Sequence, residues 1–302
     1  MDRRGPEPVL LLEGGELGAS ADFQERVDRL GQQVAFRSIE DITIRLSGGG
    51  VRMAEVVGGR DLREFASVQM LSYPRGAAAL LNVVADYLRV HGVQGVNVGG
   101  LDVPTKLYKY VRLANRGVPV PATVYLPQHH LVAAFPELVE LFDLPFVLKS
   151  VSGGCGTSRT VITDRVVFDD AVRHAAGRQV RLLAQELVPA SEQRRLFVFG
   201  DRVGAAQELA EADPTDPLGR PRWDRSRPLR VDHLPEPQVG LAVAAAEAMD
   251  YGLASVHLMK NWTTTQWQVV DISATPLTGA GAGVEGIQET YALFLGGAAQ
   301  LA

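Results

Sequence analysis

The sequence predicts an α/β protein with α+β lobes, and three observations support this prediction. The chain has 302 residues, more than one minimal core needs but few for more than about two or three compact units. Its N-terminal third alternates short apolar strands with amphipathic helices, the pattern of a parallel sheet covered by helices. Its C-terminal third contains a hairpin pattern and two further neighbouring strands.

The N-terminal third is expected to form one parallel α/β lobe. Strands are expected at 8–13, 35–39, 41–46, 51–57, 66–74 and 93–98, and helices at 21–33 and 78–92. Gly48, Gly49 and Gly50 supply a turn between two of the strands, and Gly92 ends the second helix. The glycine-rich segment 14–18 lacks the G-x-G-x-x-G spacing, so we expect no dinucleotide site there.

The middle of the chain is expected to form a second, smaller sheet. Helices are expected at 106–117 and 130–142, and strands at 119–126, 145–149, 160–162 and 179–188. Gly117 ends the first of these helices, and the prolines that follow it prevent the helix from continuing. The strand at 179–188 closes this lobe and leads into the last one.

The C-terminal third begins with a hairpin at 194–209 that turns at Gly200 and Asp201. A helix at 236–251 and strands at 254–259 and 266–273 follow. Trp262 and Trp267 flank the turn between those strands and are expected to pack on them. The apolar final helix, TYALFLGGAAQLA, packs either within the chain or against a second copy, which would make a homo-oligomer.

Residues 211–228 are rich in proline and charge and are expected to form a long polar loop. Four arginines lie in this loop of an acidic protein: Arg220, Arg222, Arg225 and Arg227. They suit an anionic carboxylate or an acidic peptide, or else they are solvated side chains of a surface loop.

Composition excludes several classes of protein. Hydrophobic residues make up 46% of the chain, and no run approaches the roughly 18 apolar residues of a spanning helix. Only about five apolar residues precede Glu13, too few for a signal peptide, so we expect a cytoplasmic protein without a membrane partner. The single cysteine, Cys155, excludes intrachain disulfides and cysteine-based zinc sites. The net charge of −5 argues against a nucleic-acid partner.

The segment PFVLKSVSGGCGTSRTVI, residues 145–162, holds the most specific local pattern. An apolar strand ends in Lys149, a loop of small residues follows with Gly153, Gly154 and Gly156, and a β-branched strand resumes. Backbone amides of such a loop can surround phosphate oxygens, and Lys149 could bind the same oxygens. A Walker loop is excluded because the lysine precedes the glycines. The alternative is an ordinary hairpin turn beside a solvated lysine.

Five segments together resemble the ATP-grasp ligases, and in particular the RimK-like branch, which joins a carboxylate to an amine. In order they are TKLYKYVRLANRGVPVPATVYL, PFVLKSVSGGCGTSRTVI, LLAQELV, RRLFVFGDRVGAA and WQVVDISATP. The resemblance covers residues 100–290 and implies an ATP-grasp fold with an N-terminal pre-ATP-grasp lobe. It implies lobes at 1–100, 101–184 (the lid subdomain) and 185–302.

The resemblance also assigns roles to residues of this sequence. Lys106 and Lys149 would bind the phosphates of ATP, and Gly153, Gly154 and Gly156 would form the lid over them. Glu186, Leu187 and Val188 would read adenine, and Glu192 would accept a ribose hydroxyl group. Arg195 would contact the phosphates or an acyl-phosphate, because a guanidinium group can donate two bonds to one phosphate, while Arg194 is expected to be solvated.

The metal site departs from the family pattern of an aspartate on one strand and a Glu-x-Asn pair on the next. Here these positions are His257, Asp271 and Ser273. Only Asp271 keeps a carboxylate, and a neutral imidazole suits Mn²⁺ or a softer metal better than Mg²⁺. A histidine in a strand is more often a packing residue than a ligand, so nucleotide binding is better supported than turnover.

Two functions therefore remain open. The first is an ADP-forming ligase that uses ATP with Mg²⁺ or Mn²⁺, makes an acyl-phosphate, and joins a small-molecule or peptide carboxylate to an amine. The second is a degenerate ATP-grasp protein that binds nucleotide, a peptide or a partner without ligation. The residues at 257 and 273 favour the second function, whereas Lys106, Lys149, Arg195 and Asp271 favour the first.

Overall fold

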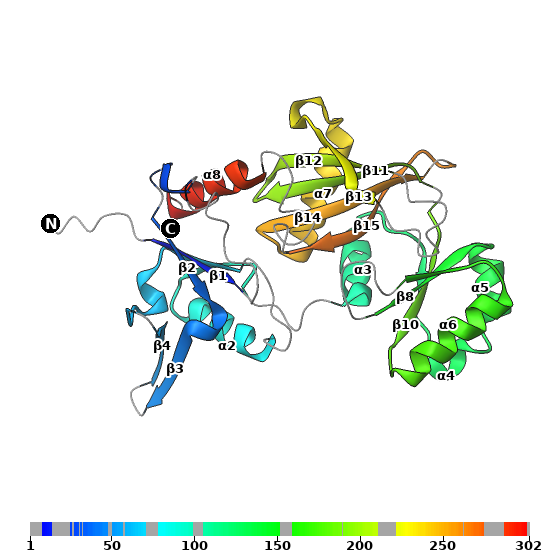
Figure 1. Cartoon of the computed structure of the whole chain (residues 1–302), viewed down its shortest axis with the longest axis horizontal. Helices are drawn as coiled ribbons and strands as arrows, with labels where there is room; N and C mark the ends of the chain where they lie inside the picture. The colour runs from blue at the N-terminus through cyan, green and yellow to red at the C-terminus, as the bar shows by residue number, and fades with distance from the viewer. Residues whose placement is uncertain are drawn as a thin grey trace.

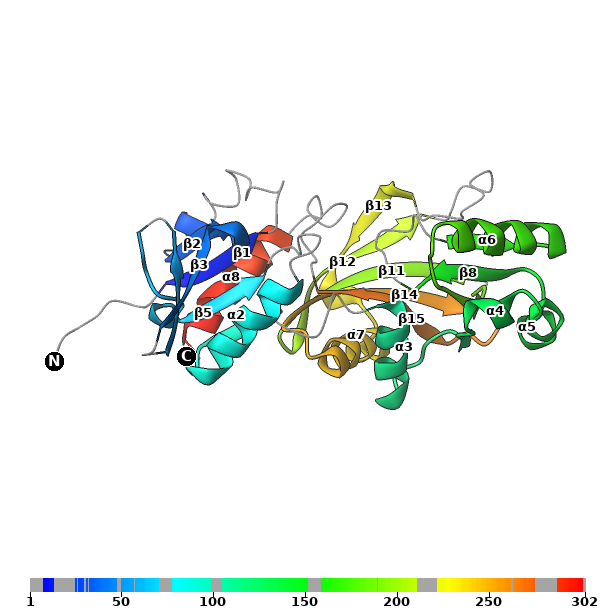
Figure 2. The same ribbon diagram turned by 90° about the horizontal axis from the view of Figure 1, so that it is seen from below.

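The computed structural model describes residues 8–300 except 14–24, 26, 30, 32, 48–49, 57, 71–77, 99–104, 152–158, 189, 211–221, 262 and 275–286. Three larger sheets follow one another along the molecule (Figures 1 and 2). The N-terminal sheet lies at one end, a five-stranded sheet in the middle and a four-stranded sheet at the other end. No helix among the described residues is long and apolar enough to cross a membrane.

The N-terminal sheet is parallel, as predicted, with the strand order β2-β1-β5-β6. Its strands are β1 (Val9–Glu13), β2 (Val34–Ser38), β5 (Ser67–Met70) and β6 (Gln94–Val96). In β1, Leu10 and Leu12 pack with helix α2 (Ala78–Val90), whereas Val9 and Leu11 pack with helix α8 (Ile287–Gln300). The unbroken apolar run of β1 is therefore explained by helices on both faces of the sheet.

Two strands predicted for this lobe lie outside its parallel sheet. β3 (Ile42–Ser47) and β4 (Gly50–Glu55) form their own two-stranded antiparallel sheet (Figure 1). The connection between them is too short for a parallel crossover, so only antiparallel pairing is open to them. Two short 3₁₀ turns, η1 (Ile39–Asp41) and η2 (Leu62–Glu64), flank this hairpin.

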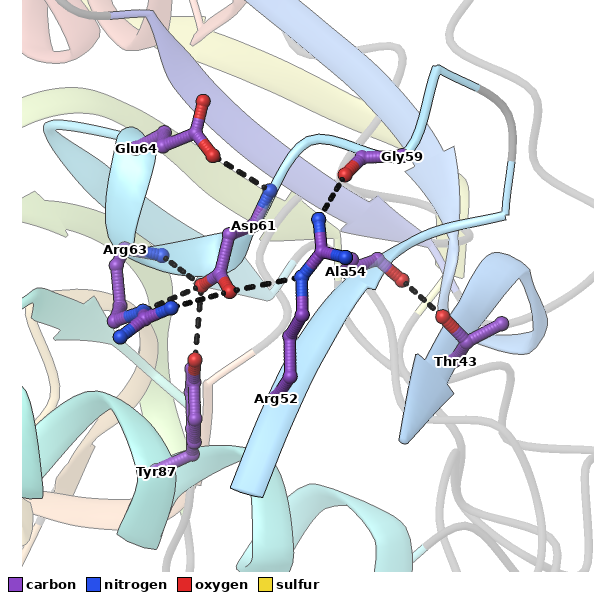
Figure 3. Close-up of polar contacts among 8 residues, drawn as sticks. All are labelled: Thr43, Arg52, Ala54, Gly59, Asp61, Arg63, Glu64 and Tyr87. Carbon is purple, nitrogen blue, oxygen red and sulfur yellow. Dashed lines mark hydrogen bonds and ion pairs between the residues drawn. The ribbon is translucent and has the colours of Figure 1, made fainter. Parts of the chain in front are cut away.

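A buried carboxylate ties the hairpin to the rest of the lobe (Figure 3). Asp61 is 3% exposed, and its oxygens accept bonds from Arg63 Nε and Nη2 at 2.9 Å and from Tyr87 Oη at 2.8 Å. Arg52 Nε of β4 lies 3.5 Å from Asp61 Oδ2, and Glu64 accepts from the Asp61 backbone. Burial acts to raise the pKa of Asp61, but the bonds from Arg63 and Tyr87 lower it to about 2. We call these residues the Asp61 cluster.

The four-stranded sheet is antiparallel with the order β7-β10-β8-β9. Its strands are β7 (Thr123–Val124), β8 (Phe146–Ser150), β9 (Arg159–Ile162) and β10 (Leu182–Glu186), and its helices are α4 (Gln128–Leu131), α5 (Phe135–Phe142) and α6 (Arg165–Gly177). Residues 163–178, for which the patterns above yielded no prediction, hold the whole of α6. Asp164 begins this helix by accepting from Val167 N at 2.9 Å, and Phe168 packs on the sheet.

The five-stranded sheet is antiparallel with the order β13-β12-β11-β14-β15. Its strands are β11 (Ala190–Phe199), β12 (Arg202–Ala210), β13 (Arg222–Leu229), β14 (Leu253–Asn261) and β15 (Trp267–Ser273). Helices α3 (Lys106–Asn115) and α7 (Glu236–Met249) and the turn η3 (Val231–His233) accompany it. Trp267 packs against the core beneath this sheet, as expected, whereas Trp262 lies outside the described residues.

The prediction of a polar loop over 211–228 is wrong for its second half. Residues 222–229 form the edge strand β13, which pairs antiparallel with β12. Pro228 is compatible with this pairing because an edge strand leaves one row of backbone groups without a neighbouring strand. Arg227 is ion-paired with Glu208 of β12. Residues 211–221, with Arg220, lie outside the described residues.

Helix α8 packs within the chain, between the N-terminal sheet and the five-stranded sheet. Tyr291 and Leu295 are buried against β1 on one side and against Phe197 and Phe199 of β11 on the other. A side chain at Gly204 of β12 would clash with Thr290, so this glycine permits the close approach of α8. The amide of Asn97, which follows β6, donates to the carbonyl oxygens of Leu253 at 2.8 Å and Ala274 at 2.6 Å.

Candidate functional site

One face of the five-stranded sheet carries a row of charged side chains, and we call it the polar face. Leu196 and Val198 of β11 pack with α7, so Arg195 lies on the opposite side of the sheet. The strand register places Arg195 opposite His257, and His257 opposite Asp271. The polar face therefore holds an arginine, a histidine and an aspartate side by side on three neighbouring strands.

A second row on the polar face holds Arg195 in place. Ser255 lies opposite Ser273, and this pair is two residues along the strands from the pair of His257 and Asp271. Arg195 Nη2 donates to Ser255 Oγ at 3.0 Å, and the guanidinium group lies 5.1 Å from the centre of the Phe197 ring. The planar group is therefore oriented by a hydrogen bond and a ring face.

Helix α3 docks on the edge strand β15 and brings Lys109 to the polar face. Thr105 begins the helix by accepting from Tyr108 N at 3.2 Å. Tyr110 Oη donates to the Val270 carbonyl at 2.7 Å, and Lys109 Nζ donates to the Ile272 carbonyl. The same ammonium group lies 3.6 Å from Asp271 Oδ1. Backbone carbonyls of an edge strand thus fix two adjacent side chains of the helix.

Lys149 of β8 is partly buried where the four-stranded sheet meets α3. Its Nζ donates to Gln185 Oε1 at 2.5 Å and to Tyr110 Oη at 3.3 Å, and Gln185 Nε2 donates to Thr123 Oγ1 at 2.8 Å. Burial, helped by the positive charge of Arg159, lowers the pKa of Lys149 to about 7. A bound anion would stabilise the charged form, because it would supply the counter-charge that is missing.

Lys106 and Arg159 lie near Lys149. The backbone N–H of Lys106, the first residue of α3, donates to the Val151 carbonyl at 2.9 Å, which links α3 to the end of β8. Arg159 pairs with Lys149 across β8 and β9. Both cations act to lower the pKa of Lys149, so each is close enough to contribute to the charge of the site.

The electrostatic balance of the polar face is positive. Burial acts to raise the pKa of Asp271, but Lys109, Lys106 and Lys149 hold it below the usual value. Burial lowers the pKa of His257 to about 3, against the opposing effect of Asp271 and in the same direction as Arg195. His257 is therefore uncharged near neutral pH, and one carboxylate faces several cations. Such an arrangement favours an anionic ligand.

Residues 186–188 form the connector from β10 to β11, and they lie at the other end of the polar face. Val188 is buried with Met259 and Val270 in a small apolar cluster, and Gln268 Nε2 donates to Glu186 Oε1 at 3.4 Å. Leu187 lies between Glu186 and Val188, where no strand is formed. The structure thus brings the predicted connector to the same face as Asp271, at a position with an apolar surface beside a carboxylate.

Glu192 and Arg194 lie on the opposite face of the sheet. Glu192 accepts from Lys260 Nζ at 2.7 Å and from Arg194 Nη2 at 2.8 Å, and Arg194 also donates to Gln238 of α7 at 2.5 Å. The prediction that Arg194 is solvated is therefore wrong. Alternation along β11 puts both residues on the α7 side, so Glu192 is not brought to the polar face. Gln193 lies two residues before Arg195 on β11, so its side chain points to the same face as Arg195.

Three glutamines on the polar face have unused hydrogen-bonding capacity. The register places Gln193 beside Met259, Gln207 beside Arg195 and Gln268 beside Met259. Within the part of the chain that the structure describes, Gln193 Oε1, Gln207 Nε2 and Gln268 Oε1 are buried and make no hydrogen bond. Buried polar atoms almost always have a partner, so these atoms are suited to a bound ligand or to ordered water.

The predicted glycine lid cannot be compared with the structure. Gly153, Gly154, Gly156 and Cys155 fall in residues 152–158, outside the described residues. The strands on either side, β8 and β9, pair as expected for a hairpin, with Lys149 opposite Arg159.

Several residues at or near the polar face were missed in the sequence: Lys109, Tyr110, Arg159, Gln185, Gln193 and Gln207. One signal could have found Lys109. The chain has only four lysines among its 30 basic residues, and three of them, Lys106, Lys109 and Lys149, are the cations nearest Asp271. In a chain that otherwise uses arginine, the few lysines mark positions where a compact ammonium group is required.

No family model matches the sequence. The structure is similar to the ATP-grasp ligase PsnB solved with a phosphomimetic variant of its minimal precursor, Mg and ADP. The TM-score is 0.72 at 14% identity, over 98% of this chain and 100% of that chain. A RimK domain ATP-grasp protein from Sphaerobacter thermophilus DSM 20745 gives 0.64 at 19% identity, over 95% and 98%. The D-cycloserine synthetase DcsG gives 0.66 at 20% identity, over 97% and 100%.

These similarities extend over nearly the whole chain at low sequence identity, so they define the architecture. They cover the parallel N-terminal sheet and both of the larger antiparallel sheets. The chain has the ATP-grasp fold.

Proposed function

We propose that this protein is an ATP-dependent ligase of RimK-like type, which joins a carboxylate to an amine and releases ADP and phosphate. One observation carries the proposal. Lys106, Lys109 and Lys149 gather with Arg195 around the single carboxylate of Asp271, between the two antiparallel sheets of an ATP-grasp fold. Phosphoryl transfer depends mainly on positioning and charge stabilisation, and this face is built for both.

The phosphates of ATP would bind at Lys106 and Lys149. Gln185 and Tyr110 hold the Lys149 ammonium group in a fixed position, so the protein does not have to order that side chain when the nucleotide binds. The terminal phosphate carries about two negative charges, which favours the charged form of Lys149. Lys149 then donates to phosphate oxygens and offsets the charge that develops during transfer.

The acyl end of the reaction would lie at Arg195. An oxygen of the substrate carboxylate attacks the γ-phosphorus, a new P–O bond forms, and the bond from the γ-phosphorus to the bridging oxygen breaks to release ADP. The amine nitrogen then attacks the acyl carbon, phosphate leaves with the C–O electron pair, and the amine loses a proton. Arg195, held by Ser255, donates to the acyl-phosphate oxygens, and Gln207 beside it offers a further N–H donor.

The adenine ring would lie against Val188, Met259 and Val270, with Glu186 and the connector backbone at its edge. The ring is flat and apolar on both faces, so a small buried aliphatic surface is a suitable base for it. Gln193 Oε1 is a hydrogen-bond acceptor at this end of the polar face, in the region where Glu192 was expected to bind the ribose.

Asp271 is the residue that would hold a divalent cation. When bound, such an ion supplies charge neutralisation for the phosphates. The predicted metal ligands offer little more than this one carboxylate. Among the described residues, no group of three or more His, Cys, Asp or Glu side chains could hold a metal ion. His257 is partly buried and uncharged, and Ser273 offers a hydroxyl, so neither provides a second carboxylate.

The substrates are proposed to be a peptide or a small molecule carrying the carboxylate, with an amine as the second substrate. Two comparisons support this range: PsnB has been solved with its precursor peptide PsnA2 and AMPPNP, and DcsG is a synthetase of a small molecule. We retain the proposed lobes at 1–100, 101–184 and 185–302, and cytoplasmic location, as parts of the same proposal.

The second candidate function is nucleotide or peptide binding without ligation. One observation favours it, namely that His257 and Ser273 leave Asp271 as the only carboxylate of the predicted metal set. Release of ADP separates the two functions. We expect ADP release from ATP that depends on an added acid and amine, in Mg²⁺ or Mn²⁺, and that is lost in Arg195→Ala. Tight ADP binding without release across a broad panel of acids and amines would favour the binder.

A further inference from the structure

The inference concerns how this site neutralises a nucleotide, and it rests on the proposed function. Asp271 is half exposed, and its Oδ1 accepts from its neighbour Ile272 N at 2.9 Å. The remaining predicted metal ligands, His257 and Ser273, are neutral. A hard divalent cation prefers a cage of several oxygen donors, and one carboxylate cannot form that cage alone.

Lys109 lies where its ammonium group competes with a cation for Asp271. Its Nζ is 3.6 Å from Asp271 Oδ1 and also donates to the carbonyl oxygen of Ile272. Two anchors on β15 therefore hold the group beside the carboxylate, and its side chain is 16% exposed. An ammonium group fixed in this way adds positive charge to the polar face and reduces the attraction of Asp271 for metal.

The protein itself supplies charge that could balance a bound nucleotide. Lys106, Lys109 and Lys149 act on Asp271, and Arg159 and Arg195 act on the neighbouring His257. The terminal phosphate of a nucleotide brings about two negative charges. Among the described residues, these cations outnumber the Asp271 carboxylate that they surround, which favours binding of such an anion.

We propose that the Lys109 ammonium group takes over part of the charge that divalent cations would otherwise provide, so that this chain binds nucleotide with little dependence on metal. Any metal that does bind is a single ion held at Asp271. A compact ammonium group is suited to this role because it is a point charge, whereas a planar guanidinium spreads its charge over a fork of donors.

The test is calorimetric titration of the full chain with ADP, in MgCl₂ and in EDTA. In the wild-type protein, we expect EDTA to weaken ADP binding by less than about fivefold, because a charge-assisted contact already serves the phosphates. In Lys109→Gln we expect EDTA to weaken binding by about thirtyfold or more, a size typical of losing one such contact. Glutamine keeps a donor for the Ile272 carbonyl but carries no charge, so the docking of α3 is retained.

Three further variants sharpen the comparison. Lys109→Arg keeps the charge and should retain weak dependence on metal. Lys260→Gln removes a lysine that pairs with Glu192 on the opposite face, so the ratio of affinities with and without metal should stay at the wild-type value. Asp271→Asn removes the one carboxylate, so ADP should bind more tightly in EDTA and the residual effect of Mg²⁺ should disappear.

Two results would overturn the inference. The first is a wild-type affinity that falls by about a hundredfold in EDTA, which would mean that metal carries the charge. The second is a Lys109→Gln variant with the wild-type ratio and an unchanged circular dichroism spectrum. In both cases ADP still binds, so the proposed function survives. Absence of ADP binding under every condition would overturn the proposed function and the inference together.

Discussion

Two aspartates in this molecule have opposite surroundings. Asp61 in the N-terminal lobe is 3% exposed, and Arg63, Tyr87 and the more distant Arg52 complete its hydrogen bonds and ion pairs (Figure 3). Asp271 on the polar face is half exposed and faces more cations than it can pair with. A balanced network of this kind contributes to folding, whereas an excess of one charge is tolerated where a ligand later balances it.

The charged groups around each aspartate should therefore affect different measurements. In the Asp61 cluster, removal of the acid breaks the bonds that the buried carboxylate accepts from Arg63 and Tyr87, and the cost falls on the free energy of unfolding. On the polar face, removal of a cation relieves repulsion in the free protein, and the cost falls on ligand affinity. The following predictions test this division, beginning with the largest expected effect.

We expect Asp61→Asn to lower the free energy of unfolding by about 3 kcal/mol, because the buried carboxylate accepts charge-assisted bonds from Arg63 and a bond from Tyr87 that a neutral amide replaces poorly. Urea unfolding followed by circular dichroism measures this change. The affinity for ADP should stay at the wild-type value, since the Asp61 cluster lies in the N-terminal lobe. A loss of affinity without a loss of stability would contradict the division between the two regions.

Lys149→Met should give the reverse result. We expect ADP affinity to fall by about 1.5–3 kcal/mol, the value of a charge-assisted bond. Stability at pH 6 should be unchanged or higher, because burial lowers the pKa of Lys149 and so penalises its charged form in the folded protein. Calorimetry and urea unfolding on the same sample check both parts. Unchanged ADP affinity in a folded variant would remove Lys149 from the phosphate site.

Acid should destabilise the protein through Asp61. The pKa of this group is lowered to about 2 in the folded protein, below its ordinary value, so its contribution is present above the ordinary carboxylate range and is lost as the pH falls from about 4 to 2. We expect a loss of about 2 kcal/mol over that interval. Unfolding curves at several pH values should show this loss in the wild type and a smaller loss in Asp61→Asn.

The smallest effect is expected for the double change His257→Asp with Ser273→Asn. Two more oxygen donors beside Asp271 should strengthen Mg²⁺ binding in the presence of ADP by about tenfold. Manganese binding followed by electron paramagnetic resonance, with Mg²⁺ as competitor, measures the change. If metal affinity does not move, His257 is a packing residue, and ions bind elsewhere.

The fold could be predicted wherever the sequence pattern of a single segment determined its secondary structure. The apolar run of β1 and the helices at its faces gave the parallel lobe, and the Gly200–Asp201 turn gave the hairpin of β11 and β12. Strand β13 was missed because its pairing with β12 is a tertiary contact that outweighs proline-rich composition. Helix α6 could have been found, because Phe168, Val172 and Ala175 recur at helical spacing.

The site was predictable only in part, because its members meet through docking and register. Lys149 and Asp271 stand out in the sequence, but Arg159 reaches Lys149 only through the pairing of β8 with β9. Lys109 reaches Asp271 only because α3 docks on the edge of β15. Simple alternation could have separated Glu192 from Arg195, since residues three apart in a strand point to opposite faces.

The position of α8 has a consequence for the order in which the chain can fold during synthesis. β1 leaves the ribosome long before Tyr291 and Leu295, which cover one of its two faces. Until those residues emerge, helix α8 is absent from the cluster that contains Val9, Leu11, Phe197 and Phe199. Apolar surfaces exposed in this way promote aggregation. A ribosome that stalls before Ile287 would therefore hold a chain whose sheets are made but lack the helix that packs between them, which makes this interval the one in which a chaperone that binds apolar surface is most useful.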